Sequence, residues 1–137
     1  MPFIGTEPAV SLDIVHDDSI VEKSVALTAG GSSPDTINVD LSAGNVFHVT
    51  ATQNETRFNF QNIPSGKAMG FTMRITRNNS NGAFNIDFTN NSAFTVKFAD
   101  GDNPTIMANG ETDIYTFYKD EVSNTIFYGA LAVNAVA

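Results

Sequence analysis

The stretch "NVFHVTATQNETRFNFQNIPSGKAMGFTMRIT", residues 45–76, alternates apolar and polar side chains in three short runs. The runs centre on Phe47, Phe58 and Met73. A period of two sends successive side chains to opposite faces of a strand, so each run predicts a β-strand with one buried and one solvent-exposed face. The Asn, Gly and Pro residues between the runs predict turns.

The same alternation returns in residues 84–88 and 94–98, and turn-forming clusters separate the runs at intervals of about ten residues. No window combines the period and the caps of an α-helix. Short strands at regular spacing are typical of an all-β, antiparallel β-sandwich or jelly-roll-like fold, and this is the predicted fold class. The polar segment "RNNSNGA", residues 77–83, predicts a hairpin that pairs residues 71–75 with residues 84–88.

The two C-terminal strand candidates carry apolar residues on both faces. They are "TDIYTFY", residues 112–118, and "NTIFYGALAV", residues 124–133. A strand of this kind is either central in a fold or covered by another subunit. We therefore assign a self-association interface to the aromatic residues of these strands, which are Tyr115, Phe117, Tyr118, Phe127 and Tyr128. Packing in the chain's own core and a carbohydrate-binding platform are the alternatives for the same side chains.

Residues 1–34 differ in composition from the rest of the chain. They hold two short strand candidates, residues 10–15 and 24–28, separated by the acidic segment "HDDS" and followed by "AGGSSP". The Gly, Ser and Pro residues predict a hinge. We therefore predict an N-terminal extended arm or edge hairpin over residues 1–34 and a β-sandwich body over residues 35–137. The sequence shows no internal repeat with a period of about 20–50 residues.

Length and charge narrow the function classes. At 137 residues the chain has the size of one domain, and the lack of cysteine excludes disulfides, thiolate metal sites and cysteine nucleophiles. Fifteen acidic and seven basic residues give a net charge of −8, which opposes binding to nucleic acid or to an anionic membrane. Without a signal peptide or a run long enough to span a bilayer, we expect a soluble chain that is synthesised in a cytoplasm.

Candidate catalytic and metal-binding residues are few. His16 lies in an acidic predicted turn and His48 on the polar side of a strand, so both are interpreted as surface residues. The segment "DGDN", residues 100–103, resembles part of a calcium loop, but Glu111 does not complete the ligand set, and a plain turn is preferred. The sequence predicts no catalytic residue, no cofactor and no metal site, so we expect that the chain is not an enzyme.

The segments "INVDLSAGNVFHVTATQNETRFNFQNIPSGKAMGFTMRIT" and "NIDFTNNSAFTVKFADGDNPTIMANGETDIYTFYKDEVSNTIFYGAL" contain a series of motifs. These are an Asp-Leu-Ser-x-Gly-Asn opening at residues 40–45, a Phe-x-Val strand, an Asn-x-Pro-x-Gly turn at residues 62–66, "YTFY" at residues 115–118 and "YG" at residues 128–129. The series, which covers residues 36–131, resembles a β-rich module of tailed-bacteriophage virion proteins. The middle hairpin of that family often carries tryptophan, which this chain lacks, and we expect Phe88 and Phe98 to fill the same volume.

The resemblance implies a structural function in a phage particle. The preferred interpretation is a capsid decoration (cement) protein on the outer capsid surface of the virion, which binds the major capsid protein shell and stabilises it. The alternative is a small tail-fibre or head-fibre protein that binds a host glycan or receptor. A homotrimer is preferred, with a dimer next. We expect the arm to contact the major capsid protein through its apolar residues, which are Phe3, Ile4, Val10, Leu12 and Ile14.

Overall fold

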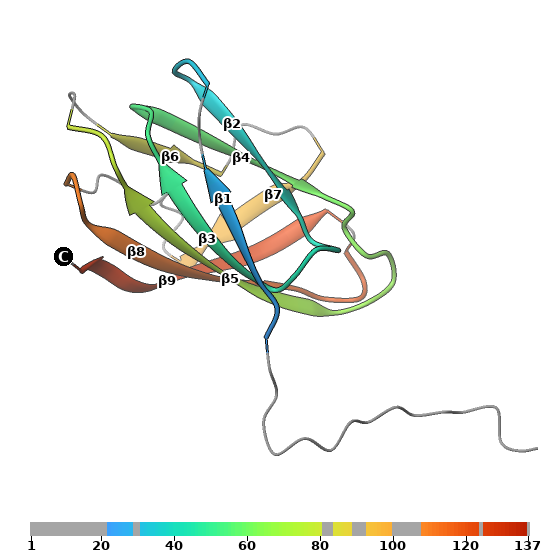
Figure 1. Ribbon diagram of the computed structural model, residues 1–137. Coiled ribbons are helices and arrows are strands. Elements are labelled where there is room, and N and C mark those ends of the chain that lie inside the picture. Colours follow the sequence, from blue (N-terminus) through green and yellow to red (C-terminus); the bar gives the residue numbers. More distant parts are fainter. Residues whose placement is uncertain are drawn as a thin grey trace, which may run out of the picture.

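The computed structural model describes residues 22–28, 31–80, 84–88, 93–99, 108–123 and 125–136 (Figure 1). These residues form nine strands and no α-helix, so the prediction of an all-β fold is confirmed. The strands are β1 (Ser24–Thr28), β2 (Asp35–Asp40), β3 (Val46–Ala51), β4 (Glu55–Gln61), β5 (Met69–Arg77), β6 (Asn85–Asp87), β7 (Thr95–Phe98), β8 (Thr112–Lys119) and β9 (Ile126–Val136).

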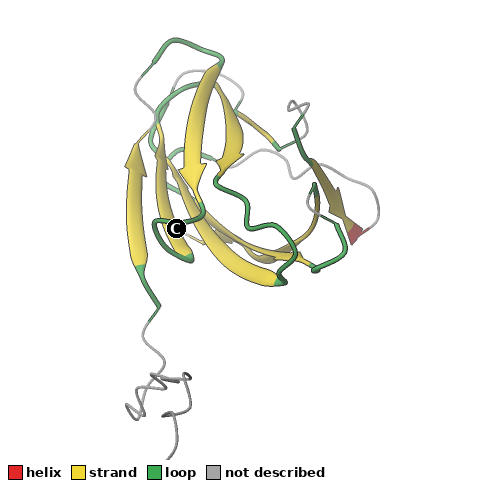
Figure 2. Cartoon of the chain, turned by 90° about the vertical axis from the view of Figure 1, so that its right-hand side faces the viewer, coloured by secondary structure: helices red, strands yellow, loops and turns green. Residues whose placement is uncertain are grey.

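The strands form two sheets whose apolar sides share one core, and Figure 2 shows the strands from the side. The six-stranded sheet has the order β1-β3-β5-β8-β9-β7, and the three-stranded sheet has the order β2-β4-β6. From β1 to β6 the chain alternates between the two sheets. The result is a β-sandwich in which each sheet buries the inner face of the other.

Most neighbouring strands run parallel, so the antiparallel part of the prediction is wrong. The parallel pairs are β1–β3, β3–β5, β2–β4, β4–β6 and β7–β9, and the described antiparallel pairs are β5–β8 and β8–β9. The cause is the path of the chain between β1 and β6. Each turn sends the chain into the opposite sheet, and when the chain returns to the first sheet it runs in the same direction as before.

The predicted hairpin through "RNNSNGA" is also absent. β5 pairs with β3 and β8 in the six-stranded sheet, whereas β6 pairs with β4 in the other sheet. The side chains of Phe71 and Phe88 therefore approach the core from opposite sides, rather than from one sheet face as predicted. The alternation in the sequence places both residues in the core but does not say which sheet supplies them.

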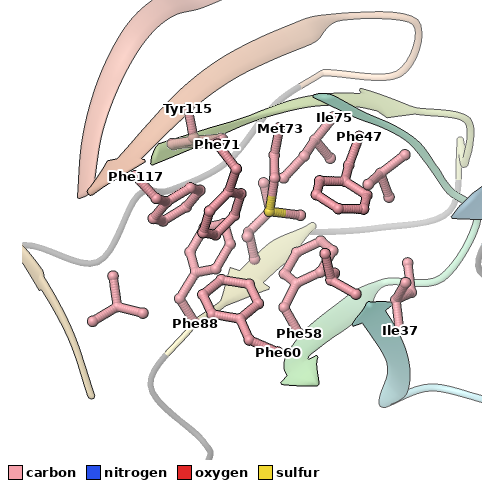
Figure 3. Close-up of a cluster of buried hydrophobic side chains, with 14 of the residues drawn as sticks. Ile37, Phe47, Phe58, Phe60, Phe71, Met73, Ile75, Phe88, Tyr115 and Phe117 are labelled. Carbon is pink, nitrogen blue, oxygen red and sulfur yellow. The ribbon is translucent and has the colours of Figure 1, made fainter. Parts of the chain in front are cut away.

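The core is aromatic, and Phe60 lies at its centre. Its ring centroid lies 5.1 Å from that of Phe71, 4.5 Å from that of Phe94, 5.6 Å from that of Phe117 and 5.1 Å from that of Phe127. Figure 3 shows rings from both sheets pointing toward one another in this region. Edge-to-face and stacked pairs at such distances contribute about 0.5–1.5 kcal/mol each beyond the burial of their surface.

The N-terminal boundary of the sandwich differs from the predicted one. β1 pairs with β3 as the edge of the six-stranded sheet, so a boundary after residue 34 would cut this sheet. Residues 31–34 lead into β2 and are held to the body, because the Gly31 N–H donates to Asp35 (3.3 Å) and the Glu55 N–H donates to the Ser33 hydroxyl (3.2 Å). This part of "AGGSSP" connects the two sheets instead of forming a hinge between an arm and the body.

Two glycines allow strands to approach closely. A Cβ on Gly44 would lie 2.5 Å from the Lys23 carbonyl oxygen, just before β1. A Cβ on Gly129 would lie 2.5 Å from the ring of Phe98, its partner in the β7–β9 pair. Both positions therefore exclude any side chain unless the backbone or the neighbouring ring moves.

Candidate interaction surface

The predicted self-association residues lie on both faces of β8 and β9. Tyr115, Phe117 and Phe127 point inward and are 0%, 3% and 0% exposed. Their rings pack in the core beneath the six-stranded sheet, so the assignment of these three residues to an interface is wrong. Core packing within the chain, the alternative from the sequence, explains them because the three-stranded sheet covers this side.

The other two predicted residues, Tyr118 and Tyr128, point outward. They are direct partners in the β8–β9 pair and are 50% and 47% exposed. The same row continues across the sheet, with Gly70 of β5 opposite Tyr118 and Lys97 of β7 opposite Tyr128. We call these four positions the tyrosine row. Two exposed tyrosines therefore stand side by side between a glycine and a lysine.

The rest of the outer face of the six-stranded sheet is rich in hydroxyl groups. Its threonines are Thr28, Thr50, Thr72, Thr76, Thr95, Thr112 and Thr116. The hydroxyls of Thr76 and Thr112 lie 2.8 Å apart and share a hydrogen bond. Asp113 is the only acidic residue within the six strands, and its side chain is buried on the inner side. The outward-facing side chains described on these strands therefore include no carboxylate.

Sequence analysis missed two charged side chains on the inner side of β8. Lys119 is fully buried, and its Nζ donates to three backbone carbonyl oxygens, those of Lys67 (2.9 Å), Asp120 (2.9 Å) and Ser123 (3.1 Å). The ammonium group thus ties the loop before β5 to the turn between β8 and β9. The sequence contained a signal for the burial of Lys119, because this residue alternates in step with Tyr115 and Phe117 and therefore faces the same side of β8.

Asp113 stands at the other end of the same inner row. Its carboxylate accepts a hydrogen bond of 2.7 Å from the Tyr115 hydroxyl, and both groups are buried. Burial raises the pKa of Tyr115 above its ordinary value, and the hydrogen bond and the charge of Asp113 raise it further. These groups are closed off from solvent, so they stabilise the core and offer no surface for a ligand.

Three residues of the sequence motifs at residues 40–45 and 62–66 meet at one end of the three-stranded sheet. Asp40 accepts hydrogen bonds from the backbone N–H (2.9 Å) and hydroxyl (2.6 Å) of Ser42 and from the side-chain amide of Asn62 (2.8 Å). These hydrogen bonds hold the pKa of Asp40 below its ordinary value. Asn62 adopts a positive φ of 54° in the turn after β4. The motif residues therefore fix two turns, which is a structural role.

Two of the candidate catalytic and metal-binding residues, His48 and Glu111, lie within the described residues. His48 is half-buried on the outer face of β3, and the carboxylate of Glu111 accepts a hydrogen bond from the Ala108 N–H within its own turn (2.6 Å). Within the described ranges, no three His, Asp or Glu side chains lie together in a way that could hold a metal ion. The same ranges contain no helix long and apolar enough to cross a membrane.

Several predicted residues lie outside the described residues. They are His16, the segment 100–103, and the arm residues Phe3, Ile4, Val10, Leu12 and Ile14.

No family model, curated protein or solved structure matches this chain. The candidate interaction surface is therefore defined by the exposed residues of β8 and β9 and by the outer face that surrounds them.

Proposed function

We propose that this chain is a structural protein of a bacteriophage particle, a capsid decoration protein that binds the outer face of the major capsid protein shell. One observation carries the proposal. The exposed large apolar side chains of the described residues all lie on β8, β9 and the turn between them, namely Tyr118, Val122, Tyr128 and Leu131. Tyr118 and Tyr128 are register partners on the outer face and Val122 lies in the adjacent turn, whereas Leu131 pairs with Tyr115 and stands at the other parity of β9. Exposed apolar side chains that lie side by side, as the two tyrosines do, are typical of a protein contact.

The second ground for the proposal is the resemblance of residues 36–131 to a β-rich module of phage virion proteins. The motif residues that the structure describes hold turns or fill the core, as those of a structural module would. A decoration protein acts by adding contact area between neighbouring capsid subunits. Burial of apolar surface contributes about 25 cal/mol per Å² before the losses of association are subtracted. A small net gain at each site is multiplied over the many sites of a shell, while a net charge of −8 per copy keeps the particles apart in solution.

Self-association remains part of the proposal, with a homotrimer preferred and a dimer next. Of the five aromatic residues assigned to this interface, Tyr118 and Tyr128 are the two that a partner copy can reach. The contact with the major capsid protein is proposed for the arm that precedes β1. This division keeps the two kinds of contact at different parts of the chain.

A truncation tests the proposal. Because β1 belongs to the sandwich, the deletion must stop at residue 21 and leave Ser24–Thr28 in place. We expect the truncated protein to fold and to lose binding to capsids, as measured by copurification with particles that lack the native protein. Particles without the protein should assemble and release DNA at a lower temperature. Truncated protein that still fills the shell would contradict the role of the arm.

A second candidate is a small tail-fibre or head-fibre protein that binds a host glycan. The exposed pair Tyr118 and Tyr128 favours it, because tyrosine rings offer an apolar face and a polar hydroxyl together. The same particles distinguish the two candidates. Particles that lack the protein, withstand heat as well as complete particles and fail to adsorb to cells would favour the fibre protein over the decoration protein.

A further inference from the structure

The chain as a whole is acidic, whereas the charged side chains that point outward from the six-stranded sheet are basic. The chain carries 15 acidic and 7 basic residues, yet the one acid within the six strands, Asp113, is buried on the inner side. Arg74 and Lys97 both point outward and are exposed. At physiological ionic strength charges are largely screened beyond about 8 Å, so each of these cations acts on a ligand bound close to it, and the net charge of the whole chain counts for less there.

The tyrosine row gives this face a defined geometry. Gly70, Tyr118, Tyr128 and Lys97 occupy one register row across β5, β8, β9 and β7. Neighbouring strands lie about 4.8 Å apart, so the row spans about 14 Å. Gly70 has no side chain to cover the flank of Tyr118, and the open flank is available to a flat ring. Lys97 places an ammonium group at the other end of the row.

Hydroxyl groups border the tyrosine row. Thr72 and Thr116 are register partners in the next outward-facing row of β5 and β8. Thr116 is exposed and Thr72 is half-buried, so both lie at the surface of the outer face. A hydroxyl can donate one hydrogen bond and accept two, which suits a ligand that itself carries many hydroxyl groups.

We propose that the tyrosine row binds an acidic polysaccharide, a glycan that carries carboxylate groups. The apolar faces of its sugar rings stack on Tyr118 and Tyr128, its hydroxyls bond with the threonines, and its carboxylates pair with Lys97 and Arg74. The proposal deepens the second candidate function, but binding is a property of the isolated chain. Its test therefore does not depend on whether the chain also decorates a capsid.

A second copy of this chain is the competing occupant. Two copies that packed these faces together would bury Arg74 and Lys97 of both copies in a contact to which the six strands supply no outward-facing carboxylate. The loss of hydration of these unpaired cations opposes a face-to-face contact, so the glycan site belongs with the fibre candidate, whereas self-association through the two tyrosines belongs with the decoration candidate. The six strands themselves direct no carboxylate at an acidic glycan, and the acids nearest to Tyr118 in the sequence, Asp120 and Glu121, lie in the turn after β8.

The test uses the full chain on an array of bacterial surface polysaccharides that includes acidic and neutral members. We expect retention on acidic members, and at least a tenfold loss of affinity in Tyr118→Ala and Tyr128→Ala. Lys97→Gln should lose several-fold on acidic members and change little on neutral ones. Raising the salt concentration should weaken the wild type more than Lys97→Gln. The matched control is Thr36→Ala, an exposed residue on the outer side of β2 in the three-stranded sheet, and it should bind as the wild type does.

Other outcomes overturn the proposal. Retention of no polysaccharide, or equal retention of wild type and both tyrosine variants, would remove the site. Retention of neutral members alone would remove the role of the cations. Sedimentation of the same variants tests the competing occupant. A wild-type oligomer that becomes a monomer in Tyr118→Ala and Tyr128→Ala, without polysaccharide binding, would assign the face to a second copy.

Discussion

The inner and outer faces of β8 and β9 carry similar residues in different surroundings. On the inner face Phe117 and Phe127 touch the rings of the core, while on the outer face Tyr118 and Tyr128 stand beside each other in contact with solvent. Apolar residues on both faces of a strand therefore do not identify one interface. One face belongs to the core, and only the other is available to a ligand or partner.

Truncation of neighbouring aromatic residues gives the largest expected effect. Phe127→Ala removes a ring that contacts Phe60, Phe71 and Phe94, and it should lower the free energy of unfolding by about 3–5 kcal/mol. Tyr128→Ala, one residue away on the outer face, should lower it by at most about 1 kcal/mol, the contribution of its cross-strand pair with Tyr118. Urea unfolding measures both variants. A similar loss in both would show that another copy covers Tyr128 in solution.

The second-largest difference in stability is expected between a lysine on the inner face of the six-stranded sheet and a lysine on its outer face. Lys119→Met keeps most of the side-chain volume but leaves three backbone carbonyls without their donor, so we expect a loss of about 2–4 kcal/mol. Lys97→Met lies on the exposed outer side and is the matched control, with little change expected. Thermal and urea unfolding compare the two. A stable Lys119→Met variant would mean that water satisfies these carbonyls.

The alternation of side chains made most strands predictable from the sequence. Phe47, Phe58 and Met73 lie on buried faces as expected, because the period of two is a local property of a strand. Strand pairing was not predictable in the same way. The residues of "RNNSNGA" indicate that the chain leaves β5, but the choice between an antiparallel neighbour and the opposite sheet depends on contacts distant in sequence.

The candidate surface was predictable in part. The alternation along β8 puts Tyr118 and Tyr115 on opposite faces, but the alternation alone does not say which face is covered. The three-stranded sheet determines which face is covered, because it packs over the side of Tyr115. The lack of outward-facing acids on the six strands is likewise a product of pairing, because these strands come from separate parts of the chain.

The third-largest difference in stability is expected between the tyrosines on the two faces of β8. Tyr115→Phe removes the donor to the buried Asp113, with an expected loss of about 1.5–3 kcal/mol, while Tyr118→Phe should change little. In the unfolded chain tyrosine ionises near pH 10, but burial and Asp113 raise the pKa of Tyr115 in the fold. Above pH 10 the unfolded state therefore binds fewer protons than the folded state, and stability falls as pH rises.

This alkaline decrease is the measurement that separates a pKa effect from simple loss of a hydrogen bond. Wild type and Tyr118→Phe should both lose stability between about pH 9 and pH 11, as read from urea midpoints. Tyr115→Phe should lose less over the same interval, since the group that causes part of the decrease is gone. An equally steep decrease in Tyr115→Phe would mean that Tyr115 is accessible to ionisation in the fold.

The smallest effect extends the comparison to the three-stranded sheet, whose exposed end carries Asp40. The side chain of Ser42, the side chain of Asn62 and the backbone N–H of Ser42 all donate to its carboxylate, and they hold its pKa below the ordinary value of 3.8. The stabilising contribution is present above pH 3.8 and is lost as pH falls through the lowered pKa of the folded state. Asp40→Asn should therefore make the acid decrease in stability shallower. Urea midpoints at about pH 6 and pH 3 measure the change. Ser42→Ala, which removes one donor and keeps the carboxylate, should give an intermediate slope. A slope equal to that of the wild type in both variants would show that Asp40 does not cause the acid sensitivity.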